Sequence, residues 1–219
     1  MNIPGIYKKY NIMPQLAEHQ LKVAGVAVFI LDHSSLIIER QEIITACLLH
    51  DMGNIIKFDL AQAGRLYPGR FSQEELAYWQ EARAGQIKKY GPDEHRASME
   101  IAREIGVSAR VLELIDCIGF QNGKVNAQSD DFGKKICAYS DMRVGLNGII
   151  SLEERFLDLR VRYGRKHMLM GGNENLRLEF EAGLREIEKQ IFIKCKIKPE
   201  EITESEVLKV IDALNSWEI

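Results

Sequence analysis

Apolar residues recur along most of the chain at the three- and four-residue spacing of amphipathic helices. The clearest stripe follows Pro14, a residue suited to the first turn of a helix. Its members, at helical spacing, are Leu16, His19, Val23, Val26 and Ile30. A second apolar segment predicts a helix over residues 39–51, and Gly53 follows where a helix end favours a left-handed residue.

Capping residues mark the starts of further helices. Ser72 with Glu75, and Ser151 with Glu154, match the capping-box pattern. Together with single Asp and Ser caps, they predict helices over about 72–90, 93–104, 108–118, 130–144 and 151–165, a long helix from 173 to 198, and a last one after 203. Residues 53–72, which contain glycine and proline, are expected to form a long irregular loop.

The fold class follows from this pattern. We find no convincing strand and no internal repeat, so the sequence predicts an all-α fold. The segment 145–150 is a weak break, because Ile149 and Ile150 are apolar. We therefore expect residues 146–219 to form a helical extension that packs on the preceding core.

Composition and charge exclude several classes of protein. The 219 residues are 46% hydrophobic and 28% charged, as in ordinary globular proteins, and the net charge of −3 favours neither a nucleic acid nor an anionic membrane as partner. The N-terminal MNIPGIYKKY has no apolar core of a signal peptide, and the longest apolar run, 23–31, is too short to cross a bilayer. The four dispersed cysteines favour a reducing compartment, so we expect a cytoplasmic protein.

Three segments carry candidate chemistry: LAEHQLKVAGVAVFIL with His19, ITACLLHDMGN with His50 and Asp51, and ICAYSDMRV with Asp141. Each has an ordinary interpretation as a core histidine, a helix-end charge or a surface aspartate. However, unpaired carboxylates on apolar helix faces are costly, so the aspartates require compensating positive charge. A divalent cation held by two imidazoles and two carboxylates would compensate all four residues at once.

The order of these residues resembles a known family. A histidine, then a His-Asp doublet, then a distant Asp, within LxxHxxxVA, ACLLHDMGN and YSDMRV, is similar to the HD-domain metal-dependent phosphohydrolases, over residues 14–145. The resemblance implies an HD-domain helical bundle in residues 1–145, followed by the extension. It also implies that His19, His50, Asp51 and Asp141 bind one divalent transition metal. This donor set suits Mn, Fe, Co, Ni or Zn and does not distinguish them.

Departures from related branches refine the expectation. Branches with two metals add two histidines; His95, in YGPDEHRAS, resembles the first, but residues 111–120 contain no second. We therefore expect one ion, with His95 facing it as a catalytic group and not as a ligand. In the guanosine tetraphosphate hydrolases a Glu-Asp pair follows the His-Asp doublet. Here that stretch reads GNIIKFD, which argues against this activity. Lys57 and Arg143 are candidates for binding phosphate, or equally ordinary surface cations.

The resemblance implies a function as well. We expect hydrolysis of a phosphate mono- or diester of a nucleotide-like small molecule by a metal-activated water. The alternatives are a regulatory module that binds metal and nucleotide without turnover, and a helical protein that binds neither. The oligomeric state is left open.

Overall fold

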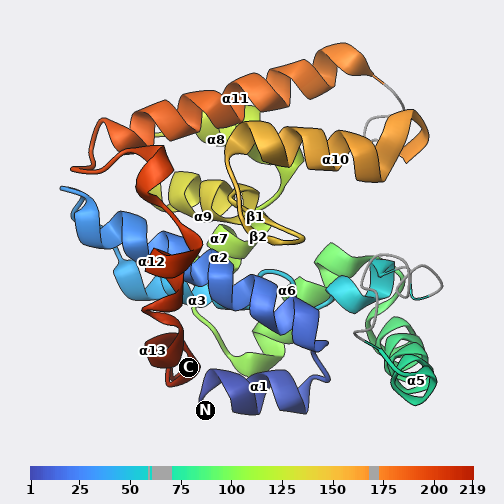
Figure 1. Ribbon diagram of the computed structural model, residues 1–219. Coiled ribbons are helices and arrows are strands. Elements are labelled where there is room, and N and C mark those ends of the chain that lie inside the picture. Colours follow the sequence, from blue (N-terminus) through green and yellow to red (C-terminus); the bar gives the residue numbers. More distant parts are fainter. Residues whose placement is uncertain (59, 61–70, 168–172) are drawn as a thin grey trace.

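Helices make up most of the chain in the computed structural model, which describes residues 1–58, 60, 71–167 and 173–219 (Figure 1). In the described ranges, β-structure amounts to the antiparallel pair β1 (Val144–Gly145) and β2 (Gly148–Ile149) and two isolated bridges. The all-α prediction is therefore confirmed. The helices are α1 (Ile3–Lys9), α2 (Pro14–His33), α3 (Arg40–Leu49), the 3-10 helix η1 (Asn54–Lys57), α5 (Gln73–Tyr90), α6 (Glu94–Ile105), α7 (Ala109–Asp116), η2 (Phe120–Asn122), α8 (Gly123–Gln128), α9 (Phe132–Met142), α10 (Leu152–His167), α11 (Glu174–Phe192), η3 (Pro199–Glu201), α12 (Glu204–Leu208) and α13 (Ile211–Asn215).

The centre of the molecule is formed by α2, α3, α7 and α9, which pack against one another. The apolar stripe predicted on α2 is buried there: Leu16, Val23, Val26 and Ile30 are all core residues. All seven residues 43–49 on the adjacent α3 are buried as well. Because α2 and α3 are covered by neighbours along most of their length, any polar side chain in these stretches must find a partner inside the protein.

The predicted helix starts are confirmed by their caps. Ser72 and Glu75 form both halves of a capping box, and Ser151 and Glu154 exchange the corresponding hydrogen bonds. Asp93, Ser108 and Asp131 each accept a hydrogen bond from a first-turn backbone N–H. These caps define the orientation in which each helix leaves its loop.

The long helix α11 ends at Phe192, earlier than the predicted residue 198. The helix ends there because the backbone of the following residues forms hydrogen bonds with the end of α2 and the segment after it. Ser35 N donates to Lys194 O, and Lys196 N donates to His33 O. These bonds bring the end of α11 beside the end of α2. A contact so distant in sequence cannot be read from helical periodicity.

Gly53 adopts a different conformation from the one predicted. Its φ of −92° and ψ of −1° are right-handed. A Cβ at this position would lie 2.4 Å from Glu94 O and 2.6 Å from the Ala97 Cβ, so glycine is needed because α6 approaches the backbone closely. The Gly53 N–H also donates to Ser98 Oγ at 2.9 Å.

The loop predicted over 53–72 begins as an ordered segment. Residues 54–57 form η1, which contacts both α5 and α6. Residues 59 and 61–70 lie outside the described residues, so the rest of this prediction is not addressed.

The last third of the chain covers one side of the centre and then returns to the N-terminus (Figure 1). Helices α10 and α11 lie side by side, α11 packs on α8 and α9, and α12 and α13 pack on α2. At the termini, Ile3 N donates to Trp217 O and Ile219 N to Met1 O. The helical extension thus lies against the rest of the chain, while a domain boundary near 145 stays a prediction. Within the described part of the chain, no helix combines the length and apolar character that crossing a membrane requires.

Candidate metal centre

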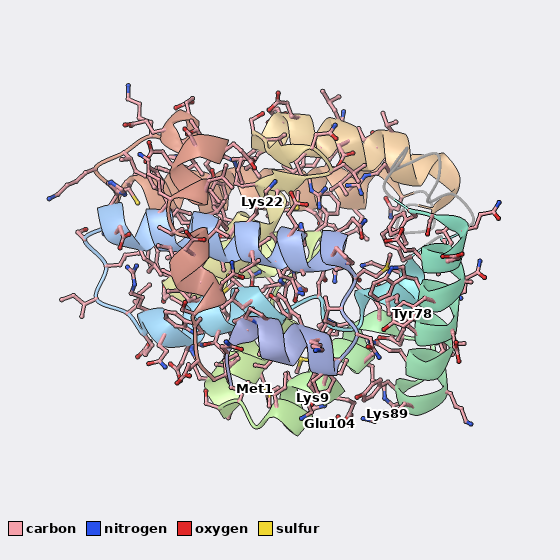
Figure 2. The ribbon with its side chains drawn as sticks, turned by 60° about the horizontal axis from the view of Figure 1, so that its bottom comes forward. Met1, Lys9, Lys22, Tyr78, Lys89 and Glu104 are labelled. Carbon is pink, nitrogen blue, oxygen red and sulfur yellow. The ribbon has the colours of Figure 1, made fainter. Side chains whose placement is uncertain are left out.

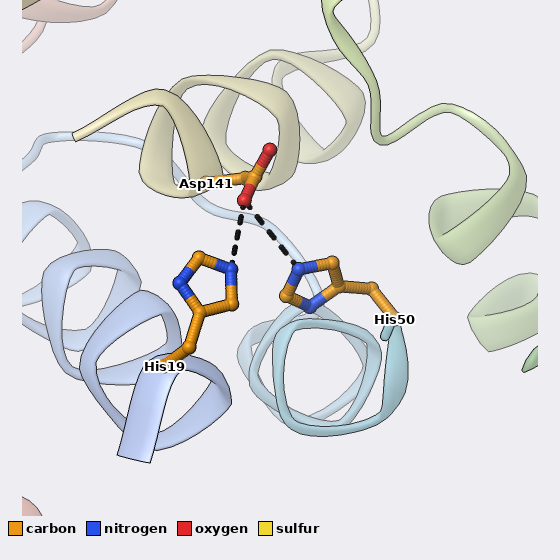
Figure 3. Close-up of side chains that lie close together, drawn as sticks. All are labelled: His19, His50 and Asp141. Atoms are coloured by element: carbon orange, nitrogen blue, oxygen red, sulfur yellow. Dashed lines mark hydrogen bonds and ion pairs between the residues drawn. The ribbon is translucent and has the colours of Figure 1, made fainter. Parts of the chain in front are cut away.

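Three predicted ligands converge from three different elements (Figure 3). His19 comes from α2, His50 from the C-cap of α3 and Asp141 from the last turn of α9. His19 Nε2 lies 3.1 Å from Asp141 Oδ1, and His50 Nε2 lies 3.5 Å from the same oxygen. One ligand atom from each of the three residues falls within 4.8 Å of the others, so this cluster could hold a metal ion.

Asp51, the fourth predicted ligand, lies at the edge of this cluster. Its Oδ2 is 3.7 Å from the Nε2 atoms of both His19 and His50. The same oxygen accepts a hydrogen bond from Asn54 Nδ2, and the backbone N–H of Asp51 donates to Gln20 Oε1 at 3.1 Å. The four predicted residues are therefore brought together, with three in the tightest group and Asp51 beside them.

The spacing of the donor atoms suits a single ion. Two donors that each bind one ion at about 2.1 Å lie about 3.0 Å apart at a right angle and about 3.4 Å apart at a tetrahedral angle. The distances of 3.1 and 3.5 Å to Asp141 Oδ1 correspond to these values. The 3.7 Å distances to Asp51 Oδ2 are slightly longer, and a small rotation of that side chain would shorten them.

His50 has the hydrogen bonding of a metal ligand. Its Nδ1–H donates to Cys47 O at 2.8 Å, which leaves the lone pair on Nε2, the nitrogen that faces the cluster. The side chain is only 3% exposed, and its Nε2 has no hydrogen-bond partner among the described residues. Because a buried polar atom without a partner costs about 1–3 kcal/mol, this nitrogen needs either a bound metal ion or a proton that faces the carboxylates of Asp51 and Asp141.

The charges of the site also call for a cation. Burial raises the pKa of the Asp141 carboxyl, but the nearby imidazoles of His19 and His50 lower it more, so this pKa lies well below its usual range. Burial lowers the pKa of His50, but the nearby carboxylates of Asp51 and Asp141 raise it to about 9. In the absence of a metal, a proton on His50 therefore compensates the two carboxylates.

Lys57 and His95, which were predicted to act on the substrate, both lie outside this cluster and near a carboxylate. Lys57 ends η1 with its side chain 47% exposed, and its Nζ lies 3.4 Å from Glu94 Oε1. His95 lies in the first turn of α6, which packs on the turn containing Gly53; its Nε2 is 2.8 Å from Asp116 Oδ1 on α7 and its side chain is 46% exposed. His95 is therefore outside the metal cluster and paired with a carboxylate.

The surroundings of Arg143 argue against the expectation that it binds phosphate. Arg143 is 3% exposed, and its guanidinium donates to Ile150 O at 2.5 Å, Pro199 O at 3.1 Å, Ile202 O at 3.3 Å and the Tyr139 hydroxyl at 2.6 Å. These bonds fasten the chain after α9 and the segment before α12 to the core. The side chain is buried because backbone carbonyls from distant parts of the sequence accept its hydrogen bonds.

Sequence reasoning missed two residues that support the cluster through Asp51, and a third that pairs with His95. Gln20 is fully buried and holds the backbone of Asp51, while Asn54 binds the side chain of Asp51. Asp116, in the segment 111–120 that contains no histidine, pairs with His95. The available signal for Gln20 was a polar residue at helical spacing between Leu16 and Val23, on the apolar stripe of α2.

The chain matches no protein-family model, no curated protein and no solved structure. The fold and the site define the class of protein: an all-α protein whose His19, His50 and Asp141 form a cluster that could hold a metal ion. The four cysteines of the chain are all free thiols.

Proposed function

We propose that this chain is an HD-type metal-dependent phosphohydrolase. It holds one divalent transition metal through His19, His50, Asp51 and Asp141, and it cleaves a phosphate mono- or diester of a nucleotide-like small molecule. The observation that carries the proposal is the buried Nε2 of His50, which has no hydrogen-bond partner among the described residues and faces Asp141. The order of the ligand residues in the sequence supports the assignment to this family.

The chemistry of the site is consistent with this role. Two imidazole nitrogens and two carboxylate oxygens suit Mn, Fe, Co, Ni or Zn. Such an ion, when bound, lowers the pKa of a coordinated water and polarises a phosphoryl oxygen. The chain itself orients the donors: Cys47 O sets the tautomer of His50, and Gln20 and Asn54 position Asp51.

Two further groups complete the proposed site. Lys57 is exposed beside the metal-binding turn and binds the phosphate as a cation, exchanging its contact with Glu94 for the substrate. His95 donates a proton to the leaving oxygen through Nδ1, while Asp116 holds the other ring nitrogen and so orients the imidazole. We place this activity in the cytoplasm, where the four free thiols stay reduced, with a small molecule and neither nucleic acid nor membrane as partner.

The test measures metal content and turnover on the same preparations. Elemental analysis of the purified chain is followed by assays of mono- and diesters, including nucleoside monophosphates and cyclic nucleotides, with each of the five metals. We expect about one ion per chain and turnover that His50→Ala and Asp141→Ala both abolish. His33→Ala, at the far end of α2, is the control. Bound metal without turnover of any ester would favour the regulatory alternative, and absence of metal would overturn the proposal.

A further inference from the structure

A cavity of about 450 Å³ opens between the N-terminal halves of α2 and α5. This volume is in the range of pockets that bind small molecules. Gln15 and Glu18 line it from α2, and Tyr78 and Trp79 line it from α5. Gln15 lies one helical turn before His19 of the candidate metal centre.

The wall formed by α5 is aromatic. The rings of Tyr78 and Trp79 meet edge to face with centroids 4.8 Å apart, and Phe71 adds a third ring to the lining. The side chain of Tyr78, labelled on α5 in Figure 2, donates from its hydroxyl to Asn11 Oδ1 at 3.0 Å, and this bond ties it to the segment between α1 and α2. Rigid aromatic faces of this kind favour a flat heterocycle, because stacking adds to the burial of apolar area.

The wall formed by α2 offers a hydrogen-bond acceptor. The Oε1 atom of Gln15 is buried and has no hydrogen-bond partner among the described residues, although the side chain lines the cavity. A buried acceptor without a donor costs about 1–3 kcal/mol. The side chain must turn toward the cavity to expose this oxygen, and a ligand N–H would then satisfy it, whereas a ligand with only acceptors would not.

The charge of the cavity selects which end of a phosphate ester can enter. Glu18 and Glu74 both line it, and Glu18 Oε1 is 2.9 Å from Lys22 Nζ. Carboxylates repel a phosphate and attract N–H donors. The anionic end of an ester is therefore directed to the metal centre and to Lys57, and the opposite end to this cavity.

The two sites are close enough to bind one molecule. Gln15 and His19 are four residues apart on α2, so they share a helix face and are separated by about 6 Å along the axis. A pentose can span this separation between a base and its 5′-phosphate.

We propose that this cavity holds the amino-bearing base of a nucleoside monophosphate whose phosphate lies at the metal centre. The base stacks on the face of one of the two rings, Tyr78 or Trp79, and meets the edge of the other. It donates its exocyclic N–H to Gln15 Oε1 once that side chain has turned toward the cavity. Only the phosphate end of this assignment rests on the proposed hydrolase function; the base site is independent of turnover.

The first experiment measures nucleoside binding, which needs neither phosphate nor metal. Calorimetry on the full chain compares adenosine with purine riboside, the same nucleoside without the amine. We expect adenosine to bind about tenfold more tightly, and Gln15→Leu to remove that preference while the variant still folds. Gln190→Leu is the matched control, because Gln190 Oε1 on α11 is also buried without a partner. Trp79 quenching by adenosine in a Trp217→Phe background locates the ligand, since these are the two tryptophans.

The second experiment separates this proposal from the hydrolase proposal. The ratio of kcat/KM for adenosine monophosphate to that for glycerol phosphate should fall about tenfold in Gln15→Leu and stay the same in Gln190→Leu. Nucleoside binding without hydrolysis of any ester would support the base site and overturn the hydrolase. Hydrolysis without nucleoside binding, equal binding of adenosine and purine riboside, or binding of choline in place of nucleosides would overturn the base site.

Discussion

His19 Nε2 lies 3.1 Å from Asp141 Oδ1, although the two residues are 122 positions apart in the chain. This contact exists only when α2 and α9 are packed together, so the donor set is a product of the tertiary fold. The unfolded chain has no equivalent site. Binding of an ion therefore adds directly to the free energy of unfolding.

Metal should stabilise the protein in proportion to its occupancy. At a free metal concentration of 100 times Kd, the free energy of unfolding should increase by about 2.7 kcal/mol. For a chain of this length, that corresponds to a rise in Tm of about 5–10 °C. Differential scanning calorimetry with metal and with chelator measures the difference. His19→Ala and Asp141→Ala should lose it, and His33→Ala should retain it; equal shifts in all three variants would contradict the assigned ligands.

Metal binding should release a proton near neutral pH. The pKa of His50 is about 9 in the metal-free protein, because the carboxylates of Asp51 and Asp141 outweigh the effect of burial. A histidine ligand must be neutral, so at pH 7 the ion displaces about one proton. Affinity should therefore increase with pH from 6 to 8, by up to about tenfold per unit, and level off above pH 9. Titration calorimetry in two buffers of different ionisation enthalpy measures the proton, and buffer-independent heats at pH 7 would contradict this account.

The clustering of His19, His50 and Asp141 could be predicted, because an ionisable side chain on an apolar helix face needs a partner inside the protein. Their convergence follows from the packing of α2, α3 and α9. The exact position of Asp51 was not predictable, because it depends on Gln20 and Asn54, two side chains that bind it through local geometry.

Other features could not be predicted because they depend on contacts between distant segments. Arg143 resembled a surface cation, but it is enclosed by carbonyls of residues 150, 199 and 202. Gly53 resembled a helix C-cap, but its role is to let α6 approach. Helical periodicity describes what a segment buries and not which distant backbone groups will surround it.

Arg143→Met should destabilise the fold without a specific effect on substrate affinity. The substitution leaves three carbonyl oxygens and the Tyr139 hydroxyl without their charged donor in a buried environment. A loss of about 3 kcal/mol or more in the free energy of unfolding is expected, because each unsatisfied buried group costs about 1–3 kcal/mol. Urea denaturation measures it. A variant with normal stability and a raised KM would instead restore Arg143 as a phosphate ligand.

Gly53→Ala should weaken both the fold and the metal site. The added methyl group meets the backbone oxygen of Glu94 and the Cβ of Ala97, so α6 or the turn after Asp51 must shift. Overpacking of this kind costs about 1–3 kcal/mol, and the shift displaces the segment that carries Asp51. Gly85→Ala is the matched control, since a Cβ there meets nothing within 4 Å and the helix α5 should gain up to about 1 kcal/mol. Equal stability and metal affinity in the two variants would show that the contact is tolerated.

His95→Ala should keep its metal and lose turnover. His95 lies outside the cluster of His19, His50 and Asp141 and is bonded to Asp116 at 2.8 Å, so its removal leaves that cluster in place. The pair is exposed and contributes at most about 1 kcal/mol to stability, so the fold should persist. If the imidazole protonates the leaving oxygen, kcat should fall about 10²- to 10⁴-fold. The decrease should be smaller for an ester such as p-nitrophenyl phosphate, whose leaving group needs no proton.

Asp116→Asn provides the second arm of this experiment, because it retains the side-chain volume while removing the charge that orients His95. We expect it to lower kcat less than His95→Ala does, and to have little further effect in the double variant, since both residues would act through the same imidazole. Metal content is measured on every variant by elemental analysis. Full activity in His95→Ala would return the pair to an ordinary surface contact, and loss of metal in that variant would make His95 a ligand.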